Sequence, residues 1–452
     1  MKLYDLNPSQ EVVKLQLQYT LDKRVVNIVA SLDFDKPFDK EIMTTAFNKM
    51  VERNDCLRIR FIKKGKKLMQ YFEEVNNVKP IKEISYYEFN TEEEQNKFFL
   101  KYKKKPIAYK KGVVIEPCFV KTFDNKYIIL IKVCHLVVDI YGLNIIFKDL
   151  TDVYNALING VELPEAPLKF EDVIINDPAN KEDESKYSKH RQFFENYWKD
   201  KEEPYFASLA GLKEPIFKKR REKKHKRNMK MFFIRNKTTG YMHKISKDTV
   251  AKAVELATKT RNSLANILFY IASITISKMN GDTPNMLPLE LCNCRGTMLE
   301  KKCAGTKVQS IGSYTEIDQN KSFNENFEKF VVMQNQLYRH INFSDQEFEI
   351  MFKKKYHASL LSTYYPITFS LIPYVKQQDA KFTIYSNEKG SLPAYLALLY
   401  DLNEGDIQMC YDVQDITTSA EDVLNYHTNY VSLINQITEN PEILIKDLKF
   451  NL

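Results

Sequence analysis

A histidine and an aspartate four residues apart are the residues best placed to carry chemistry in this chain. His135 and Asp139 stand in the run Cys134-His135-Leu136-Val137-Val138-Asp139-Ile140-Tyr141-Gly142, directly after an apolar stretch, residues 127–133, that is typical of a buried strand. An imidazole with an ordinary pKa of about 6.5 is largely neutral at pH 7, so it can accept a proton as a general base. The same spacing also occurs in His–Asp pairs that have only a structural role. The surrounding sequence therefore has to decide between a catalytic and a structural role.

Other catalytic and cofactor patterns are absent from the sequence. The 12 glycines never occur as G-x-G, which excludes the dinucleotide fingerprint and the Gly-rich phosphate loop. There is no G-x-S-x-G elbow and no H-E-x-x-H helix. Cys292, Cys294 and Cys303 form the nearest approach to a thiol cluster, but their spacing matches no common zinc pattern. We therefore expect no metal and no tightly bound cofactor.

The elements that must position His135 and Asp139 alternate between strands and helices. The patterns predict a helix over residues 39–53, two hairpins at 57–72 and 113–133, and a helix that follows Asp139 and ends near Gly160. The pair thus lies between a strand and a helix. A second series follows, with strands near 367–372 and 408–413 and helices over 246–260, 264–279 and 419–440.

The net charge of +8 comes from one segment. Residues 218–230 contain nine Lys or Arg and one acid, Glu222, and the remainder of the chain balances 58 bases against 58 acids. The segment lacks interleaved aromatic residues between Lys218 and Arg227, so it does not resemble a platform for single-stranded nucleic acid. We expect a solvated linker in this segment, and no nucleic acid as partner.

Composition indicates an ordinary soluble polypeptide. Hydrophobic residues make up 44% and charged residues 28% of the 452 residues. The N-terminus lacks the apolar region of a signal peptide, and the most apolar stretch, residues 264–276, is shorter than the ~20 residues of a membrane span. Seven cysteines, an odd number, fit reduced thiols. We expect a cytoplasmic monomer without a membrane segment.

Several further motifs occur in a fixed order along the chain. They are Leu6-Asn7-Pro8-Ser9-Gln10-Glu11, Arg53-Asn54-Asp55-Cys56-Leu57-Arg58-Ile59-Arg60-Phe61, Tyr197-Trp198, Asn293-Cys294-Arg295, Ile311-Gly312-Ser313-Tyr314 and His340. With the central run these motifs resemble, from end to end, a condensation domain of the non-ribosomal peptide synthetases, within the chloramphenicol-acetyltransferase-like superfamily. The family's H-H-x-x-x-D-G motif corresponds to residues 134–140, with Cys134 in place of the first His and Ile140 in place of the Gly.

The resemblance implies an α/β (α+β type) fold of two chloramphenicol-acetyltransferase-like subdomains that form a V-shaped pseudo-dimer. We expect the N-terminal subdomain to comprise residues 1–175, a bridging helix and the basic linker 176–230, and the C-terminal subdomain 231–452. In such domains the second His of the motif, here His135, faces a tunnel between the halves.

The resemblance also assigns roles to the site residues. His135 would accept the proton of the nucleophile, and Asp139 would organise the site through a salt bridge with an Arg, for which Arg295 is the first candidate and Arg58 the second. Cys134 would be a small buried support. Ile140 would narrow the tunnel, because a β-branched residue allows neither close approach nor φ > 0. Gly142 is a conceivable flexible point nearby.

The implied function is condensation-type acyl transfer. An acyl group, held as a phosphopantetheine thioester on an acyl or peptidyl carrier protein, would be transferred to a small amine or alcohol, forming an amide or ester. Two alternatives remain open at this point. The protein could be a non-catalytic module that binds a carrier protein, or an acyltransferase that uses free coenzyme A.

Overall fold

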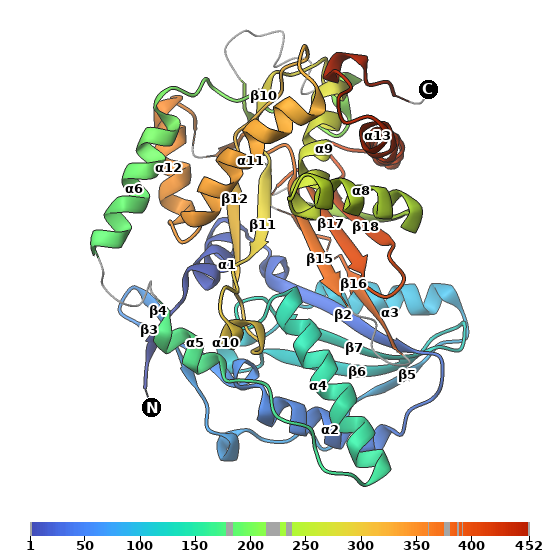
Figure 1. Cartoon of the computed structure of the whole chain (residues 1–452). Coiled ribbons are helices and arrows are strands. Elements are labelled where there is room, and N and C mark those ends of the chain that lie inside the picture. Colours follow the sequence, from blue (N-terminus) through green and yellow to red (C-terminus); the bar gives the residue numbers. More distant parts are fainter. Residues whose placement is uncertain are drawn as a thin grey trace. The chain divides into compact units, whose positions relative to one another are not determined.

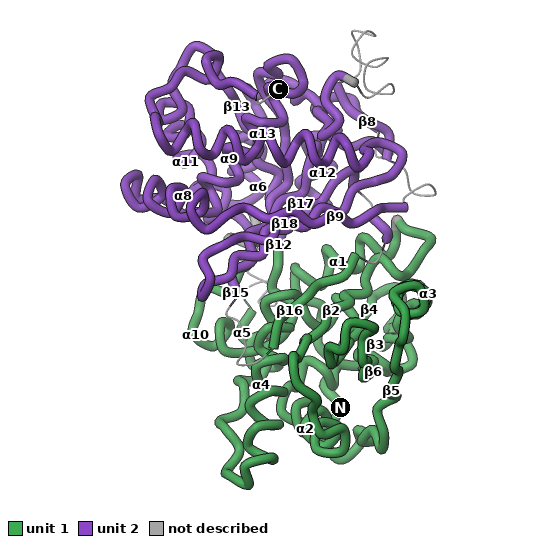
Figure 2. Tube along the Cα trace, turned by 90° about the vertical axis from the view of Figure 1, so that its right-hand side faces the viewer, with its two compact units in different colours: residues 1–183, 293–308, 376–387 green, residues 184–292, 309–375, 388–452 purple. Residues whose placement is uncertain are grey.

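The computed structural model describes residues 2–177, 184–213, 227–231, 237–359, 361–374, 380–386, 388–390 and 392–450. The chain divides into two compact units, shown in different colours in Figure 2. Unit 1 comprises residues 1–183, 293–308 and 376–387, and unit 2 comprises residues 184–292, 309–375 and 388–452. Most of the basic segment 218–230 lies outside the described residues, which resume at residue 227.

The division differs from the contiguous halves expected from the sequence. The first break, between residues 183 and 184, falls inside the expected connecting region 176–230. Two later segments, 293–308 and 376–387, instead belong to unit 1. Strand β16 (Ala380–Tyr385) accounts for one of them, because it pairs antiparallel with β2 (Asn27–Phe34) in the sheet of unit 1. Pairing between strands so far apart leaves no trace in local periodicity.

Unit 1 is built on a five-stranded sheet in the order β16-β2-β7-β6-β5 (Figure 1). A small sheet in the order β1-β4-β3 accompanies it. The remaining strands are β1 (Tyr4–Asp5), β3 (Ile59–Lys64), β4 (Lys67–Phe72), β5 (Tyr86–Glu88), β6 (Ile115–Lys121) and β7 (Tyr127–Cys134). The helices are α1 (Pro8–Tyr19), α2 (Lys40–Arg53), α3 (Glu92–Lys104), α4 (Ile140–Asn159), α5 (Phe170–Asn176) and α10 (Met298–Lys301).

Helix α4 shows how local sequence sets these elements. Asp139 caps its N-terminus by accepting a hydrogen bond from the Gly142 amide, and Gly160 ends it with φ +63°, a left-handed conformation that glycine adopts without penalty. The apolar face between these caps, including Leu143, Ile146 and Leu150, is buried in the core of unit 1. The predicted helix after Asp139 and the two predicted hairpins are therefore confirmed.

Unit 2 contains a six-stranded sheet in the order β12-β11-β15-β17-β18-β9. Strands β11, β15 and β17 run parallel, and β18 and β9 continue antiparallel. The strands are β8 (Met229–Lys230), β9 (Thr238–Ile245), β10 (Asn285–Met286), β11 (Leu289–Asn293), β12 (Val308–Gly312), β13 (Thr315–Glu316), β14 (Ser362–Thr363), β15 (Thr368–Tyr374), β17 (Ala394–Asp401) and β18 (Ile407–Gln414). The helices are α6 (Glu184–Lys199), α8 (Lys247–Lys259), α9 (Leu264–Met279), α11 (Phe323–Arg339), α12 (Asp345–Lys355) and α13 (Ala420–Glu439).

The predicted helices of unit 2 are confirmed, with serine caps at the expected positions. Ser246, Ser263 and Ser419 each accept a hydrogen bond from a backbone amide in the first turn of α8, α9 and α13. Helix α9 is buried along almost its whole length. No helix in the described ranges is long and apolar enough to cross a bilayer.

Aromatic packing gathers several of the dispersed motifs in unit 2. Trp198 is buried beside Tyr314 and Phe352, and the Tyr197 hydroxyl accepts a hydrogen bond from the Tyr314 amide at 3.1 Å. His340 stacks on a phenylalanine ring of α6 with the ring centroids 3.9 Å apart. These motif residues thus stabilise the packing of unit 2.

Candidate active site

The loop that carries His135 is held by hydrogen bonds to its backbone. His135 follows the last residue of β7, and its amide donates to the Val26 carbonyl at 2.8 Å. The hydroxyl of Thr306 donates to the His135 carbonyl at 2.7 Å. Gln10 Nε2 donates to the Leu136 carbonyl at 2.9 Å. Because all three partners lie in unit 1, the position of this loop is set within one compact unit.

The imidazole of His135 is held in one tautomer. Its Nδ1 lies 3.1 Å from the Val138 carbonyl oxygen. A carbonyl oxygen only accepts, so Nδ1 carries the proton and Nε2 keeps its lone pair. Burial lowers the pKa of His135 below its ordinary value, and the nearby carboxylate of Asp139 opposes that shift without reversing it. His135 is therefore neutral near pH 7, with an acceptor nitrogen at Nε2.

Asp139 is buried and fully hydrogen-bonded. Arg295 binds it with two parallel hydrogen bonds, Nη1 to Oδ2 at 2.9 Å and Nη2 to Oδ1 at 3.0 Å. The amides of Gly142 and Lys307 donate to the same carboxylate at 2.8 and 2.7 Å. The side chain of Arg295 is 0% exposed and that of Asp139 6%. The carboxylate therefore organises the loop and the start of α4, and none of these four hydrogen bonds comes from the imidazole.

The ion pair expected with Arg295 is thus present, and Arg58 does not take that place. The guanidinium of Arg58 donates to the backbone carbonyl of Glu73 instead. It also lies close enough to Asp55 to lower that carboxyl's pKa, although burial dominates and the pKa of Asp55 is raised. Arg58 therefore supports the neighbouring turn and not Asp139.

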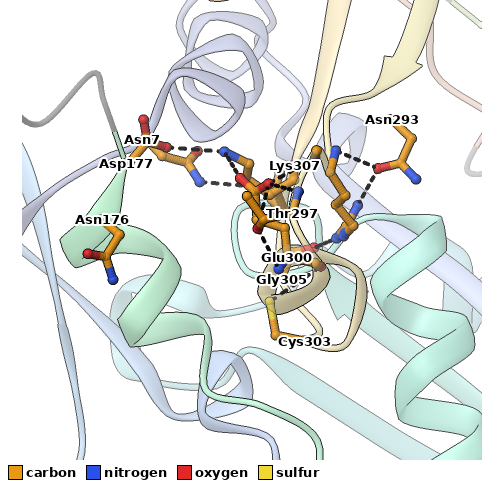
Figure 3. A network of polar contacts seen from close by, with 12 residues as sticks. Asn7, Asn176, Asp177, Asn293, Thr297, Glu300, Cys303, Gly305 and Lys307 are labelled. Atoms are coloured by element: carbon orange, nitrogen blue, oxygen red, sulfur yellow. Dashed lines mark hydrogen bonds and ion pairs between the residues drawn. The ribbon is translucent and has the colours of Figure 1, made fainter.

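The segment 293–308 supplies most of the partners of the His135 loop, and Figure 3 shows the polar contacts of Lys307 and its neighbours in this segment. Besides Arg295, Gly305 offers its carbonyl to the Arg295 Nη2 at 2.7 Å and to the Asp139 amide at 3.3 Å. The ammonium of Lys307 lies 3.2 Å from both Asp177 and Glu300, each in unit 1. This salt-bridge network fixes the segment against the end of α5.

The sequence did not identify Thr306 or Lys307 as site residues. Thr306 lies 171 positions from His135, in a stretch that carries no motif. Asn7 and Gln10 belong to the first of the sequence motifs, but the resemblance to condensation domains assigned them no role. The side-chain Nδ2 of Asn7 donates to the Thr306 carbonyl at 3.0 Å, and Asn7 and Gln10 form the capping box of α1. The capping-box spacing was the one local signal available for these two residues.

Gly142 is a point of close packing and not a flexible point. A Cβ placed on it would lie 2.8 Å from both the backbone nitrogen and the backbone oxygen of Gly305. Gly305 is restricted in turn, because it has φ +136° and a Cβ there would lie 2.3 Å from the ring of Phe170. The two glycines therefore let α4, α5 and the segment 293–308 approach each other at backbone distance.

We expect Gly142→Ala to lower the free energy of unfolding by about 1–3 kcal/mol, because the added methyl must displace backbone. The matched control is Gly296→Ala, where the nearest atom is a flexible carboxylate oxygen at 3.8 Å. Chemical denaturation of both variants measures the difference. Equal stabilities of the two variants would contradict the close-packing explanation, all the more because alanine is favoured over glycine inside a helix.

Among the described residues, no group of three or more His, Cys, Asp or Glu side chains is arranged so that it could hold a metal ion. The model of one protein family, the Condensation domain, matches residues 1–354. The chain belongs to this family. Condensation domains are acyltransferases that form amide bonds between carrier-bound substrates, which is the activity of this protein's family. A search of curated proteins found no match.

Solved condensation domains share the fold over the whole chain. The starter condensation domain of rhizomide synthetase, in complex with C8-CoA and Leu-SNAC, is 12% identical with a TM-score of 0.81, covering 100% of this chain and 98% of that one. The first condensation domain of the calcium-dependent antibiotic synthetase, in complex with a substrate analogue, is 13% identical with a TM-score of 0.81 and coverage of 100% and 99%. The X-domain from teicoplanin biosynthesis is 13% identical with a TM-score of 0.73 and coverage of 99% and 97%. These similarities establish the condensation-domain fold.

Cys134 and Ile140, the two positions at which the sequence is expected to differ from the family motif, have different structural settings. Cys134 is fully buried at the end of β7, and burial raises the pKa of its thiol to about 12, so it remains a neutral packing residue. Ile140 is the first residue of α4, where its φ is not positive, so this position does not require the conformational freedom of glycine. Its partly buried side chain packs against the core of unit 1.

The Arg53-Asn54-Asp55 motif supports the site from a distance. Arg53 binds Asp149 of α4 through Nη2 at 2.9 Å. Asp55 caps α5 by accepting hydrogen bonds from the amides of Phe170 and Glu171 at 2.8 and 2.9 Å. Since Phe170 packs on Gly305, this motif positions the helix against which the segment 293–308 rests.

Proposed function

We propose that His135 is the general base of this condensation domain. Nε2 accepts the proton of an amine or alcohol while that group attacks the carbonyl carbon of an acyl thioester. The new C–N or C–O bond forms, the C–S bond breaks, and the thiolate leaves with the proton that the imidazolium returns. The products are an amide or ester and a free thiol.

The observation that carries this proposal is the 3.1 Å contact between Nδ1 of His135 and the Val138 carbonyl oxygen. The Nδ1 proton is engaged by the Val138 carbonyl, which leaves only Nε2 for the acceptor. Asp139 is saturated by Arg295 and two amides, so it has no remaining part in proton transfer. The catalysis we propose therefore rests on one base and on the alignment of two substrates.

We propose a carrier protein as the source of the acyl group, with its phosphopantetheine arm delivering the thioester. The function of the family supports this donor. Free acyl-coenzyme A is the second donor to test, because one structurally similar condensation domain was solved with C8-CoA. We further propose that Ile140 restricts which substrates reach His135, since a branched side chain stands where the condensation-domain motif has glycine.

The pH dependence of kcat/KM tests the base. The neutral imidazole is the active form, and the pKa of His135 is lowered by burial, so activity should rise with pH along an acid limb centred below pH 6.5 and be level above it. Rates with an acyl N-acetylcysteamine thioester and an alcohol acceptor avoid titration of a carrier and of an acceptor amine. A limb centred above pH 6.5, or the same limb in His135→Asn, would contradict the assignment.

Comparison of three donors separates the proposed function from its alternatives. The same acyl group is offered on a carrier protein, on N-acetylcysteamine and on coenzyme A, with a set of amino acid amines as acceptors. A preference for the carrier-bound donor supports our proposal. A preference for acyl-coenzyme A would instead identify the protein as an acyltransferase that uses free coenzyme A thioesters. Carrier binding without any His135-dependent product would instead establish a non-catalytic binding module.

A further inference from the structure

Two basic stretches of unit 1 contain no acidic residue. Residues 60–67 hold five Lys or Arg, residues 101–112 hold six, and neither stretch contains Asp or Glu. Outside residues 218–230 the chain has equal numbers of basic and acidic residues. These two stretches are therefore local excesses of positive charge, and the acidic residues that balance them lie elsewhere in the chain. The structure decides whether the two stretches form one surface.

Contacts within unit 1 bring the two stretches together. The rings of Phe61 on β3 and Tyr109 pack edge to face with their centroids 5.8 Å apart. Tyr109 begins the short 3₁₀ helix η4 (Tyr109–Lys111), and the guanidinium Nε of Arg60 lies 3.1 Å from where a Cβ on Gly112 would be. Lys63 shares the strand face of Phe61, since side chains two apart on a strand point the same way. The tip of the β3–β4 hairpin and η4 thus form one basic region.

Five lysines of this region are exposed and take part in no ion pair among the described residues. Within the described residues no ion pair involves the five that we call the lysine surface: Lys63, Lys64, Lys66, Lys110 and Lys111. Lys64 stands directly opposite Lys67 in the β3–β4 register, and like charges in that position destabilise a hairpin. Asp5 forms an ion pair with Lys67, whose Nζ lies 2.7 Å from the Asp5 Oδ2, and with none of the five lysines of the lysine surface. Repulsion between these lysines lowers the stability of the hairpin, and a bound anionic partner would reduce that repulsion.

Hydrogen bonds link the elements that carry the lysine surface to the His135 loop at two places. The Val114 carbonyl, just after η4, accepts a hydrogen bond from the Cys134 amide at 2.9 Å. On the other side Gln70 of β4 is hydrogen-bonded at 2.7 Å to Gln10, which holds the Leu136 carbonyl. A partner bound to this surface is therefore attached to the elements that flank the catalytic histidine.

We propose that the lysine surface docks the acidic face of the carrier protein that delivers the acyl thioester, an inference that rests on the proposed function. A protein is favoured over a nucleic acid because the exposed side chains among the lysines include aliphatic ones, Ile62 at 38% and Val113 at 39%, while the aromatic Tyr109 is buried. Charge complementarity would accelerate encounter at low salt.

The test compares two variants of the full chain with equal loss of charge. The first replaces Lys63, Lys64, Lys110 and Lys111 with Ser. The control replaces Lys247, Lys321, Lys354 and Lys449, which are exposed lysines of unit 2, with Ser. Stopped-flow association with an acidic, phosphopantetheinylated peptidyl carrier domain is measured at low salt and at about 1 M salt, where the Debye length is about 3 Å.

We expect the first variant to associate about 10-fold more slowly at low salt, and the control to associate like the parent. Salt should remove the difference, and turnover of the N-acetylcysteamine thioester should be unchanged in both variants. Equal rates for all three proteins, or equal slowing of both variants, would overturn the proposal. The proposal would also be overturned if the first variant lost binding to duplex DNA while its association with the carrier stayed unchanged. The partner of the lysine surface would then be a nucleic acid. If no donor gives product but the association pattern holds, the docking surface stands and the proposed function fails.

Discussion

His135→Ala should lower kcat by about 10²–10⁴-fold, the usual contribution of a positioned general base. The substitution removes Nε2, the nitrogen left with its lone pair by the contact of Nδ1 with Val138. The backbone of residue 135 keeps its hydrogen bonds to Val26 and Thr306 in the variant, so the loop should remain in place. Single-turnover rates with a carrier-bound donor measure the effect on the chemical step.

The matched control is His135→Asn, because an asparagine amide can donate to the Val138 carbonyl as Nδ1 does but offers no base. It should be as inactive as the alanine variant, with an unchanged melting temperature and carrier binding. Activity of His135→Asn close to that of the parent would show that residue 135 acts by position and not as a base. A melting temperature well below the parent's would make the loss of activity a folding defect.

Asp139→Ala should lower the free energy of unfolding by about 3–5 kcal/mol, because it leaves Arg295 charged and buried without its partner. The side chain of Arg295 is 0% exposed, so water cannot replace the carboxylate without local opening. Two backbone amides, of Gly142 and Lys307, also lose their acceptor. Denaturant unfolding followed by circular dichroism measures the loss, and kcat should fall as well because the His135 loop loses its support.

Two controls make this result specific to the buried pair. The double variant Asp139→Ala with Arg295→Met should recover part of the stability, since the stranded charge is gone. Removing the exposed pair Lys97–Glu93, whose side chains are 73% and 78% exposed, should change stability by at most about 1 kcal/mol. A loss for Asp139→Ala no larger than for the exposed pair would mean that Asp139 does not organise the site.

Much of the secondary structure and the central pair could be predicted because their signals are local. The helix over Leu264–Met279 was predicted from an apolar run with a serine cap, and helix α4 from the residues between Asp139 and Gly160. The same holds for the hairpin turns, which Gly65 and Asn125 form with positive φ. The choice of His135 and Asp139 came from their position between a strand and a helix, together with the order of the motifs. Arg295 as the partner of Asp139 came from the resemblance alone.

Only the tertiary structure decided what surrounds the pair. Thr306 and Lys307 reach the His135 loop across about 170 residues, and β16 joins a sheet whose other strands end some 250 residues earlier. The close approach of Gly142 to Gly305 and the merging of the two lysine stretches are likewise contacts between distant segments. Such contacts depend on which surfaces pack together, a property of the whole chain's burial of apolar area and satisfaction of buried polar groups. Periodicity and capping patterns report only on a residue's near neighbours, so they locate the His135 loop but not the partners that hold it.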